Sequence, residues 1–204
     1  MRLLAGQQAP EFVARDIYGH EIALASYRAR RQPVLLIFYR SAVCPLCNIN
    51  LWHLIDHYPD YLSHGVGLLV IVESAPELVQ RFQGGLHAPF PLIADQAGEL
   101  YALYHLESSW HGTARGTLRR RVYREAKNKG LGIVPLIPGF LAMDGDRFRM
   151  PAGFLLDEHL TIRLAHYGKH SGDFLPFTII EVALAALARD ANLPRPESAD
   201  DEGM

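Results

Sequence analysis

The sequence predicts an α/β fold in which helices cover a largely parallel sheet. Two short runs, residues 33–39 and 67–73, are apolar without alternation, which is typical of strands buried on both faces. Apolar residues at spacings of three and four follow each run and indicate helices. Because strands and helices alternate along the chain, we expect right-handed crossover connections between neighbouring strands.

The N-terminal third begins with a predicted β-hairpin. Apolar residues in the segment 6–27 flank a polar corner at residues 16–20, which favours two short strands and a turn. Ser26 is the candidate cap of a short helical turn that follows. The helix after the first buried run has its apolar residues between Leu51 and Tyr58, and we expect Pro59 to end it.

The middle of the chain continues the alternation. Ser74 is the candidate cap of a helix that begins near Pro76 and ends at the two glycines of residues 84–85. A short extended segment at residues 91–93 leads to a helix from Ala97 to His105, with Asp95 at its start.

The last third predicts a hairpin and a final helix. Residues 150–156 and 160–166 have the pattern of two strands, joined by a turn at residues 157–159. A helix rich in Ala and Leu is expected from Asp173 or Phe174 to Arg189 and should pack on the sheet.

These elements predict one domain, residues 1–190, with residues 108–148 as an insertion and residues 191–204 as a disordered tail. The insertion contains many Gly and Pro residues and one helical stretch around Leu118, Val122 and Tyr123. Seven basic residues lie between Arg115 and Lys129, and they indicate either a solvated helix face or a docking surface for an acidic partner or an anionic thiol.

Composition limits the classes of function. The 204 residues are 49% apolar with a net charge of −2, so no global field favours nucleic acid or a membrane surface. The N-terminus lacks the apolar region of a secretory signal, and no run approaches the roughly 20 apolar residues that span a bilayer. We therefore expect a soluble, cytoplasmic protein with no nucleic-acid or membrane partner.

The chemistry centres on Cys44 and Cys47, the two cysteines of the chain. They lie where the first buried strand meets the following helix, and Pro45 suits the first turn of that helix. Cys44 would then be the N-cap, with its sulfur near unpaired N–H groups and the positive end of the helix dipole. Both effects favour the thiolate, so we expect a lowered pKa and a nucleophilic role for Cys44, with Arg40 either assisting or pointing into water.

Cys47 is the expected resolving thiol. Residues three apart on a helix have Cβ atoms roughly 5–6 Å apart, and a disulfide needs about 3.5–4.5 Å, which the looser N-cap geometry can supply. Cys47 would resolve a mixed disulfide or a sulfenic acid on Cys44. A zinc site lacks a second cysteine pair, a static disulfide would close too short a loop to restrain the unfolded chain, and two unrelated buried thiols would not require the Pro between them.

Four segments in order resemble the thioredoxin fold and, more closely, the alkyl hydroperoxide reductase/thiol-specific antioxidant (AhpC/TSA) group of peroxiredoxin-like proteins. They are residues 6–19 with Ala9-Pro10-Glu11-Phe12, residues 38–47, residues 91–95 and residues 150–157. The resemblance implies a three-layer α/β/α sandwich with a central mixed sheet and the insertion before a cis-Pro strand. It implies a cis Met150–Pro151 peptide that faces the cysteines and binds the substrate thiol.

The sequence departs from peroxiredoxins around the cysteines. Ser41 keeps the hydroxyl that orients the peroxide in that group, but Ile37 stands where a Pro is typical. Pro151 occupies the position of an Arg that stabilises the thiolate, and Arg149 is the nearest candidate to replace it. Residues 33–39 contain no carboxylate that would relay protons to Cys47, so no general base is assigned.

The function that follows is a thiol-dependent oxidoreductase that reduces disulfides of partner proteins or hydroperoxides. Cys44 and Cys47 are its catalytic residues, and Arg40, Ser41, Met150 and Pro151 its substrate-binding residues. A thioredoxin- or glutathione-type thiol would supply the electrons, with no metal or other cofactor, and a homodimer is left open. The alternatives are a thioredoxin-fold copper chaperone, with a His beside the two cysteines, and a redox-sensing module that docks through the basic insertion.

Overall fold

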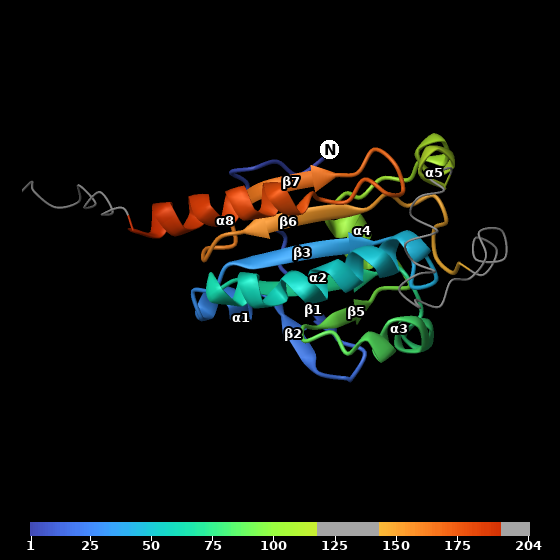
Figure 1. The fold of residues 1–204 in the computed structure, drawn as a ribbon, viewed down its shortest axis with the longest axis horizontal. Coiled ribbons are helices and arrows are strands. Elements are labelled where there is room, and N and C mark those ends of the chain that lie inside the picture. Colours follow the sequence, from blue (N-terminus) through green and yellow to red (C-terminus); the bar gives the residue numbers. More distant parts are fainter. Residues whose placement is uncertain (118–142, 193–204) are drawn as a thin grey trace, which may run out of the picture.

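A five-stranded mixed sheet forms the centre of the computed structural model, which describes residues 1–117 and 143–192 (Figure 1). The strand order is β5-β4-β3-β6-β7. The β3·β4 and β4·β5 pairs are parallel, whereas β3·β6 and β6·β7 are antiparallel. The strands are β3 (Val34–Tyr39), β4 (Gly67–Val72), β5 (Leu92–Ala94), β6 (Ala152–Leu156) and β7 (Ile162–Tyr167).

The two central strands are buried on both faces, as their sequence predicts. All residues of β3 and β4 are buried. Along β3 the side chains of Val34, Leu36 and Phe38 pack in one apolar cluster, and those between them pack in the other. The alternation of side chains therefore divides one continuous apolar run between two cores.

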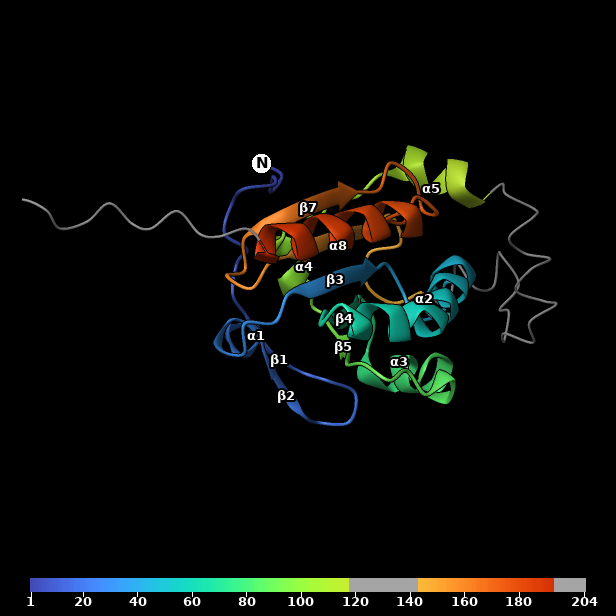
Figure 2. The same cartoon turned by 60° about the vertical axis from the view of Figure 1, so that its left-hand side comes forward.

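Helices cover the sheet on both faces, which confirms the three-layer α/β/α arrangement (Figures 1 and 2). One face carries the helices whose apolar residues share a cluster with Leu35 and Ile37, and these are α2 (Pro45–Ser63), α3 (Pro76–Phe82) and α8 (Phe177–Asn192). The opposite face is covered by α1 (Leu24–Ala29) and α4 (Glu99–Leu103). A short 3₁₀ turn, η1 (Gly84–Leu86), follows α3, and α5 (Trp110–Thr117) lies near the end of the sheet where α2 begins (Figure 2).

The N-terminal hairpin is confirmed. Strand β1 (Val13–Arg15) pairs antiparallel with β2 (Glu21–Ala23). The carboxylate of Asp16 accepts hydrogen bonds from the backbone N–H groups of Tyr18 and His20, both at 2.9 Å. This Asx-type contact is the mechanism by which Asp favours turns.

Several helix boundaries differ from the prediction, among them α4, which is Glu99–Leu103 and shorter at both ends than the expected Ala97 to His105. Helix α2 continues through Pro59 to Ser63, because the buried side chains of Leu54 and Tyr61 anchor both sides of the proline. Helix α1 begins at Leu24, so Ser26 lies inside it and caps nothing. Helix α8 begins only at Phe177. Pro176 disfavours helical geometry at the residue before it, Leu175, so the helix cannot start as early as Asp173 or Phe174.

The predicted insertion lies between α4 and β6. Residues 118–142, including the expected helix around Leu118, Val122 and Tyr123 and most of the basic residues, lie outside the described part of the chain. The predicted tail does too, except that α8 continues to Asn192. The division into one domain with an insertion stays a prediction.

Candidate active site

The two cysteines lie at the carboxyl end of β3, where the chain enters α2. Cys44 is the N-cap residue and Pro45 stands in the first turn, as predicted. The Cys44 carbonyl accepts a hydrogen bond from the N–H of Asn48 at 3.1 Å, which closes the first turn. The Cys44 sulfur does not have the geometry of a full capping hydrogen bond, although the nearby backbone N–H of Cys47 contributes to lowering the pKa of Cys44.

Arg40 is a side-chain partner of the Cys44 sulfur. Its side chain is 4% exposed, and its Nε donates to the Cys44 sulfur at 3.3 Å. A second nitrogen, Nη1, donates to the carbonyl of Arg147 at 3.5 Å. Of the two orientations left open by the sequence, the structure has the one in which the guanidinium faces the thiol.

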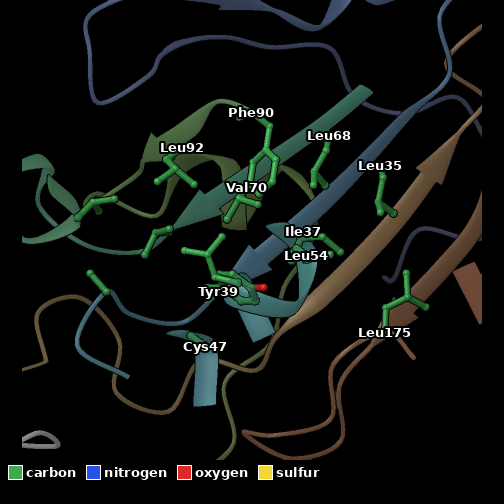
Figure 3. Close-up of a cluster of buried hydrophobic side chains, with 14 of the residues drawn as sticks. Leu35, Ile37, Tyr39, Cys47, Leu54, Leu68, Val70, Phe90, Leu92 and Leu175 are labelled. Carbon is green, nitrogen blue, oxygen red and sulfur yellow. The ribbon is translucent and has the colours of Figure 1, made fainter. Parts of the chain in front are cut away.

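The surroundings shift the pKa values of the two thiols in opposite directions. Both are free and fully buried. Burial opposes ionisation of Cys44, but the hydrogen bond from the Cys47 thiol and the charge of Arg40 together lower the pKa of Cys44 well below its ordinary value. Burial, and then the neighbouring Cys44, raise the pKa of Cys47 well above its ordinary value. Figure 3 shows Cys47 beside Tyr39 at the edge of the apolar cluster.

The hydroxyl of Ser41 has its hydrogen-bond partners elsewhere than on the two cysteines. Its Oγ lies 3.4 Å from Ser74 Oγ and accepts a hydrogen bond from the N–H of Val43 at 3.4 Å. The described contacts of Ser41 Oγ include none with the Cys44 sulfur. The structure therefore brings Arg40, but not the Ser41 hydroxyl, to the thiol.

The predicted cis peptide at Met150–Pro151 is wrong, because the described residues contain no cis peptide bond. The two isomers of an X–Pro bond differ by only about 0.5–1 kcal/mol, so the surroundings decide between them. Here the Met150 N–H donates to the Glu107 carbonyl and the Pro151 carbonyl accepts from Gly168. Antiparallel pairing joins Phe38 to Ala152, and the same register continued would put Met150 opposite Arg40.

Arg149 does not replace a thiolate-stabilising arginine. Its Nε and Nη2 each donate to Glu73 at 2.8 Å, and its Nη1 donates to the Leu106 carbonyl at 3.0 Å. Its guanidinium also lies 5.3 Å from the ring centre of Tyr101. All these contacts belong to the junction between β4, α4 and the segment before β6.

Sequence reasoning missed the buried polar residues around the cysteines, chiefly Asn48, Glu73 and Ser74. The order of the strands could have indicated the position of two of them. Glu73 and Ser74 follow the buried strand β4, and the carboxyl ends of neighbouring parallel strands meet at one edge of a sheet. They could therefore have been placed beside Arg40 and Ser41, which follow β3.

Neither a metal site nor a membrane span emerges from the described residues. In residues 1–117 and 143–192, no three side chains of His, Cys, Asp or Glu gather as metal ligands would. The copper-chaperone alternative therefore gains no support from this part of the chain. No helix there combines the length and the apolar character needed to cross a membrane.

The layered mixed sheet and the cysteine pair at the end of β3 define a thioredoxin-like α/β protein. A solved structure of peroxidoxin BcpB from Mycobacterium tuberculosis shares this fold, with a TM-score of 0.62 at 18% identity over 91% of this chain and 96% of that one. The model of the AhpC/TSA family matches residues 5–165. The chain belongs to this family.

Curated relatives are also similar in sequence. A "Putative peroxiredoxin" of Mycobacterium tuberculosis is 30% identical over 121 residues, which are 58% of this chain and 76% of that protein. The thiol-disulfide oxidoreductase ResA of Geobacillus kaustophilus is 30% identical over 102 residues, or 50% of this chain and 57% of its own. Family and relatives together identify the chain as a thiol-dependent redox enzyme.

Proposed function

We propose that Cys44 is the attacking thiolate and Cys47 the resolving thiol of a dithiol–disulfide cycle. The contact between Arg40 Nε and the Cys44 sulfur carries this proposal, because a buried thiolate needs a fixed positive partner. The opposite displacement of the two pKa values supports the same division of roles.

The same two thiols can reduce either class of substrate, a hydroperoxide or a disulfide. With a hydroperoxide, the Cys44 thiolate attacks one oxygen and breaks the O–O bond, so that a sulfenic acid forms on Cys44. The leaving alkoxide or hydroxide takes up a proton from solvent and departs as an alcohol or water. Cys47 then attacks that sulfur, releasing water and closing a Cys44–Cys47 disulfide. With a disulfide, Cys44 forms a mixed disulfide, and Cys47 displaces the substrate as its free dithiol. A thioredoxin- or glutathione-type thiol would return the protein to the dithiol form.

The burial of Cys44 favours a hydroperoxide as the first substrate to test. Its sulfur is covered, so a protein disulfide could reach it only after a large local opening. A small hydroperoxide requires less displacement of the surrounding chain. Exchange with partner disulfides is the second candidate, favoured by the similarity to ResA.

The test is the rate at which the fully reduced protein loses thiols to stoichiometric hydrogen peroxide, beside free cysteine. The Cys44→Ser and Cys47→Ser variants are measured with it. We expect the parent to react far faster than free cysteine, Cys44→Ser to abolish the fast step, and Cys47→Ser to keep it but accumulate sulfenic acid. A parent no faster than free cysteine contradicts the peroxidase proposal.

Disulfide reduction is tested separately, with a small aromatic disulfide and a protein disulfide as substrates. Activity on these without a fast peroxide step would make exchange the primary function. Cytoplasmic location, homodimer formation and redox-dependent docking of a partner stay predictions. The docking alternative would be favoured by partner binding that depends on the Cys44–Cys47 redox state.

A further inference from the structure

The peptide groups of Ala42, two residues before Cys44, are held from both sides by side chains. The Ala42 N–H donates to Ser74 Oγ at 2.9 Å, and its carbonyl accepts from Asn48 Nδ2 at 3.0 Å. All three residues are buried. Side chains rather than a strand partner therefore fix the course of the loop between β3 and α2.

Asp144 orients the Ser74 hydroxyl. Ser74 Oγ donates its hydrogen to Asp144 Oδ1 at 2.7 Å, so its lone pairs are left for the Ala42 N–H. The hydroxyl of Ser41, 3.4 Å away, must then be the donor in its contact with Ser74. The other oxygen of Asp144 accepts from the N–H of Ala75, the N-cap of α3.

Gln83 orients Asn48 in a similar way. Its Nε2 donates to Asn48 Oδ1 at 2.8 Å, which turns the amide nitrogen of Asn48 toward the Ala42 carbonyl. Gln83 is fully buried and is the C-cap residue of α3. The two sets of contacts thus start from opposite ends of the same helix and meet at one residue of the loop.

Ala42 lies midway along the chain between Arg40 and Cys44, whose side chains contact each other. Arg40 precedes it by two residues and Cys44 follows it by two, and a hydrogen bond from the Cys44 N–H to the Ser41 carbonyl at 3.3 Å closes the turn. A rotation of the Ala42 peptide would change the position of Arg40 relative to Cys44, because both are joined to it by short stretches of the loop. Such a change would weaken the 3.3 Å contact between Arg40 Nε and the sulfur, because a hydrogen bond weakens steeply with misalignment.

We propose that Ser74 and Asn48 are positioning residues that hold the Ala42 peptide and thereby keep the Arg40 guanidinium in contact with the Cys44 sulfur. Asp144 and Gln83 act through them. The proposal rests on the proposed function of Cys44 as the attacking thiolate. It assigns a role in thiol activation to residues that contact neither the thiol nor a substrate.

The test measures the pH dependence of Cys44 alkylation by iodoacetamide in the reduced protein, with the modified cysteine identified by mass spectrometry. The variants are Ser74→Ala, Asn48→Ala and the less buried Asp144→Asn. Ser74→Thr retains the hydroxyl, and Ser63→Ala removes an exposed serine hydroxyl that contacts only its own turn. Circular dichroism and thermal unfolding identify the variants that are folded.

In each folded Ala or Asn variant, we expect the midpoint of alkylation to rise by about one pH unit, with about a tenfold slower reaction below both midpoints. Ser74→Thr should restore the parent profile and Ser63→Ala should not alter it. A folded variant that is less stable but keeps the parent midpoint overturns the positioning role.

The alkylation midpoint of the parent protein distinguishes a failure of the positioning role from a failure of the proposed role of Cys44. If the parent Cys44 already titrates like an ordinary thiol, the proposed role of Cys44 fails, and the positioning role fails with it. If the parent midpoint is low and Ser74→Ala, Asn48→Ala and Asp144→Asn leave it unchanged, Cys44 stays the reactive thiolate and only the positioning role is rejected.

Discussion

Arg40 Nε lies 3.3 Å from the Cys44 sulfur inside the protein, with both side chains almost fully covered. The second arginine of this region, Arg149, is instead engaged with Glu73. The two guanidinium groups are therefore not interchangeable. Arg40 is placed to act on the ionisation of the thiol, whereas Arg149 joins segments of the chain.

Replacement of Arg40 by Met should raise the pKa of Cys44 and slow its reaction with hydrogen peroxide at neutral pH. Burial would then oppose the thiolate without a charge to offset it. We expect a loss of about 10- to 100-fold, equivalent to one to two pKa units. Arg40→Lys should lose less, because the charge remains while the planar donor does not.

The measurement is the stopped-flow rate of thiol loss as a function of pH. Arg15→Met is the control, since the hydrogen bond of this exposed arginine within the described part of the chain goes to the Gly19 carbonyl. The role of Arg40 is disproved by an Arg40→Met variant whose rate and pH midpoint match those of the parent.

The lowered pKa of Cys44 should also make the free energy of unfolding depend on pH. A thiol whose pKa is lower in the folded state stabilises the protein fully above its unfolded pKa, about 8.5, and that stabilisation is lost as the pH falls through the folded value. In Cys47→Ser, where only Cys44 titrates as a thiol, stability should therefore rise with pH across this window.

Urea unfolding of Cys47→Ser at a series of pH values measures this slope, and the double variant with Cys44→Ser removes it. The difference between the two curves isolates Cys44 from Asp16 and Glu73, whose shifted pKa values affect both proteins alike. Parallel curves would show that Cys44 is not an unusually strong acid in the folded protein.

Helix α2 contains an internal proline, Pro59, that we expect to reduce the stability of the protein. Pro59 lies inside the helix, where it removes one backbone hydrogen bond and crowds the carbonyl four residues earlier, at about 3 kcal/mol. The flexibility that Ala adds to the unfolded chain offsets about 0.4–1 kcal/mol. Pro59→Ala should therefore stabilise the protein by about 2 kcal/mol.

Urea unfolding tests this expectation, with Pro45→Ala as the matched control. Pro45 stands in the first turn of the same helix, where its missing N–H has no helical partner. Its replacement regains no hydrogen bond, so it should only lower stability, by about 0.4–1 kcal/mol. Equal effects at both positions would mean that the position of the proline within the helix does not matter.

The sequence predicted what depends on local pattern. The continuous apolar runs of β3 and β4, the turn at Asp16 and the N-cap position of Cys44 follow from residues near one another in the chain. Pro59 shows the limit, because the packing of Leu54 and Tyr61 outweighs a local helix breaker.

The surroundings of the cysteines depend on residues far apart in the chain. Glu73 and Arg149 are separated by 76 positions, and Ser74 and Asp144 by 70. No pattern of neighbouring residues predicts such long-range pairs. Ser74 was expected to cap α3 by its hydroxyl, but that hydroxyl bonds Asp144, and the Asp144 carboxylate accepts from the Ala75 N–H instead. The fold was therefore more predictable than the groups that adjust Cys44.

Loss of Arg149 should reduce stability without altering the pKa of Cys44. Arg149→Met leaves the Glu73 carboxylate, which is 4% exposed, without its two-armed partner. Removing one member of a buried pair costs about 3–5 kcal/mol; we expect about 2–3 kcal/mol here, because Arg149 is itself partly exposed. The alkylation midpoint of Cys44 should stay at the parent value.

The pH dependence of this loss has a definite sign. Burial raises the pKa of Glu73 even beside Arg149, and without Arg149 that pKa should rise further. A carboxyl with a raised pKa destabilises the folded state as the pH increases through the folded value, so the deficit of Arg149→Met should shrink on acidification. Adding Glu73→Gln should recover part of the stability at neutral pH. A deficit that is constant with pH would contradict the pairing, and a shifted Cys44 midpoint would give Arg149 the role at the thiol that the structure assigns to Arg40.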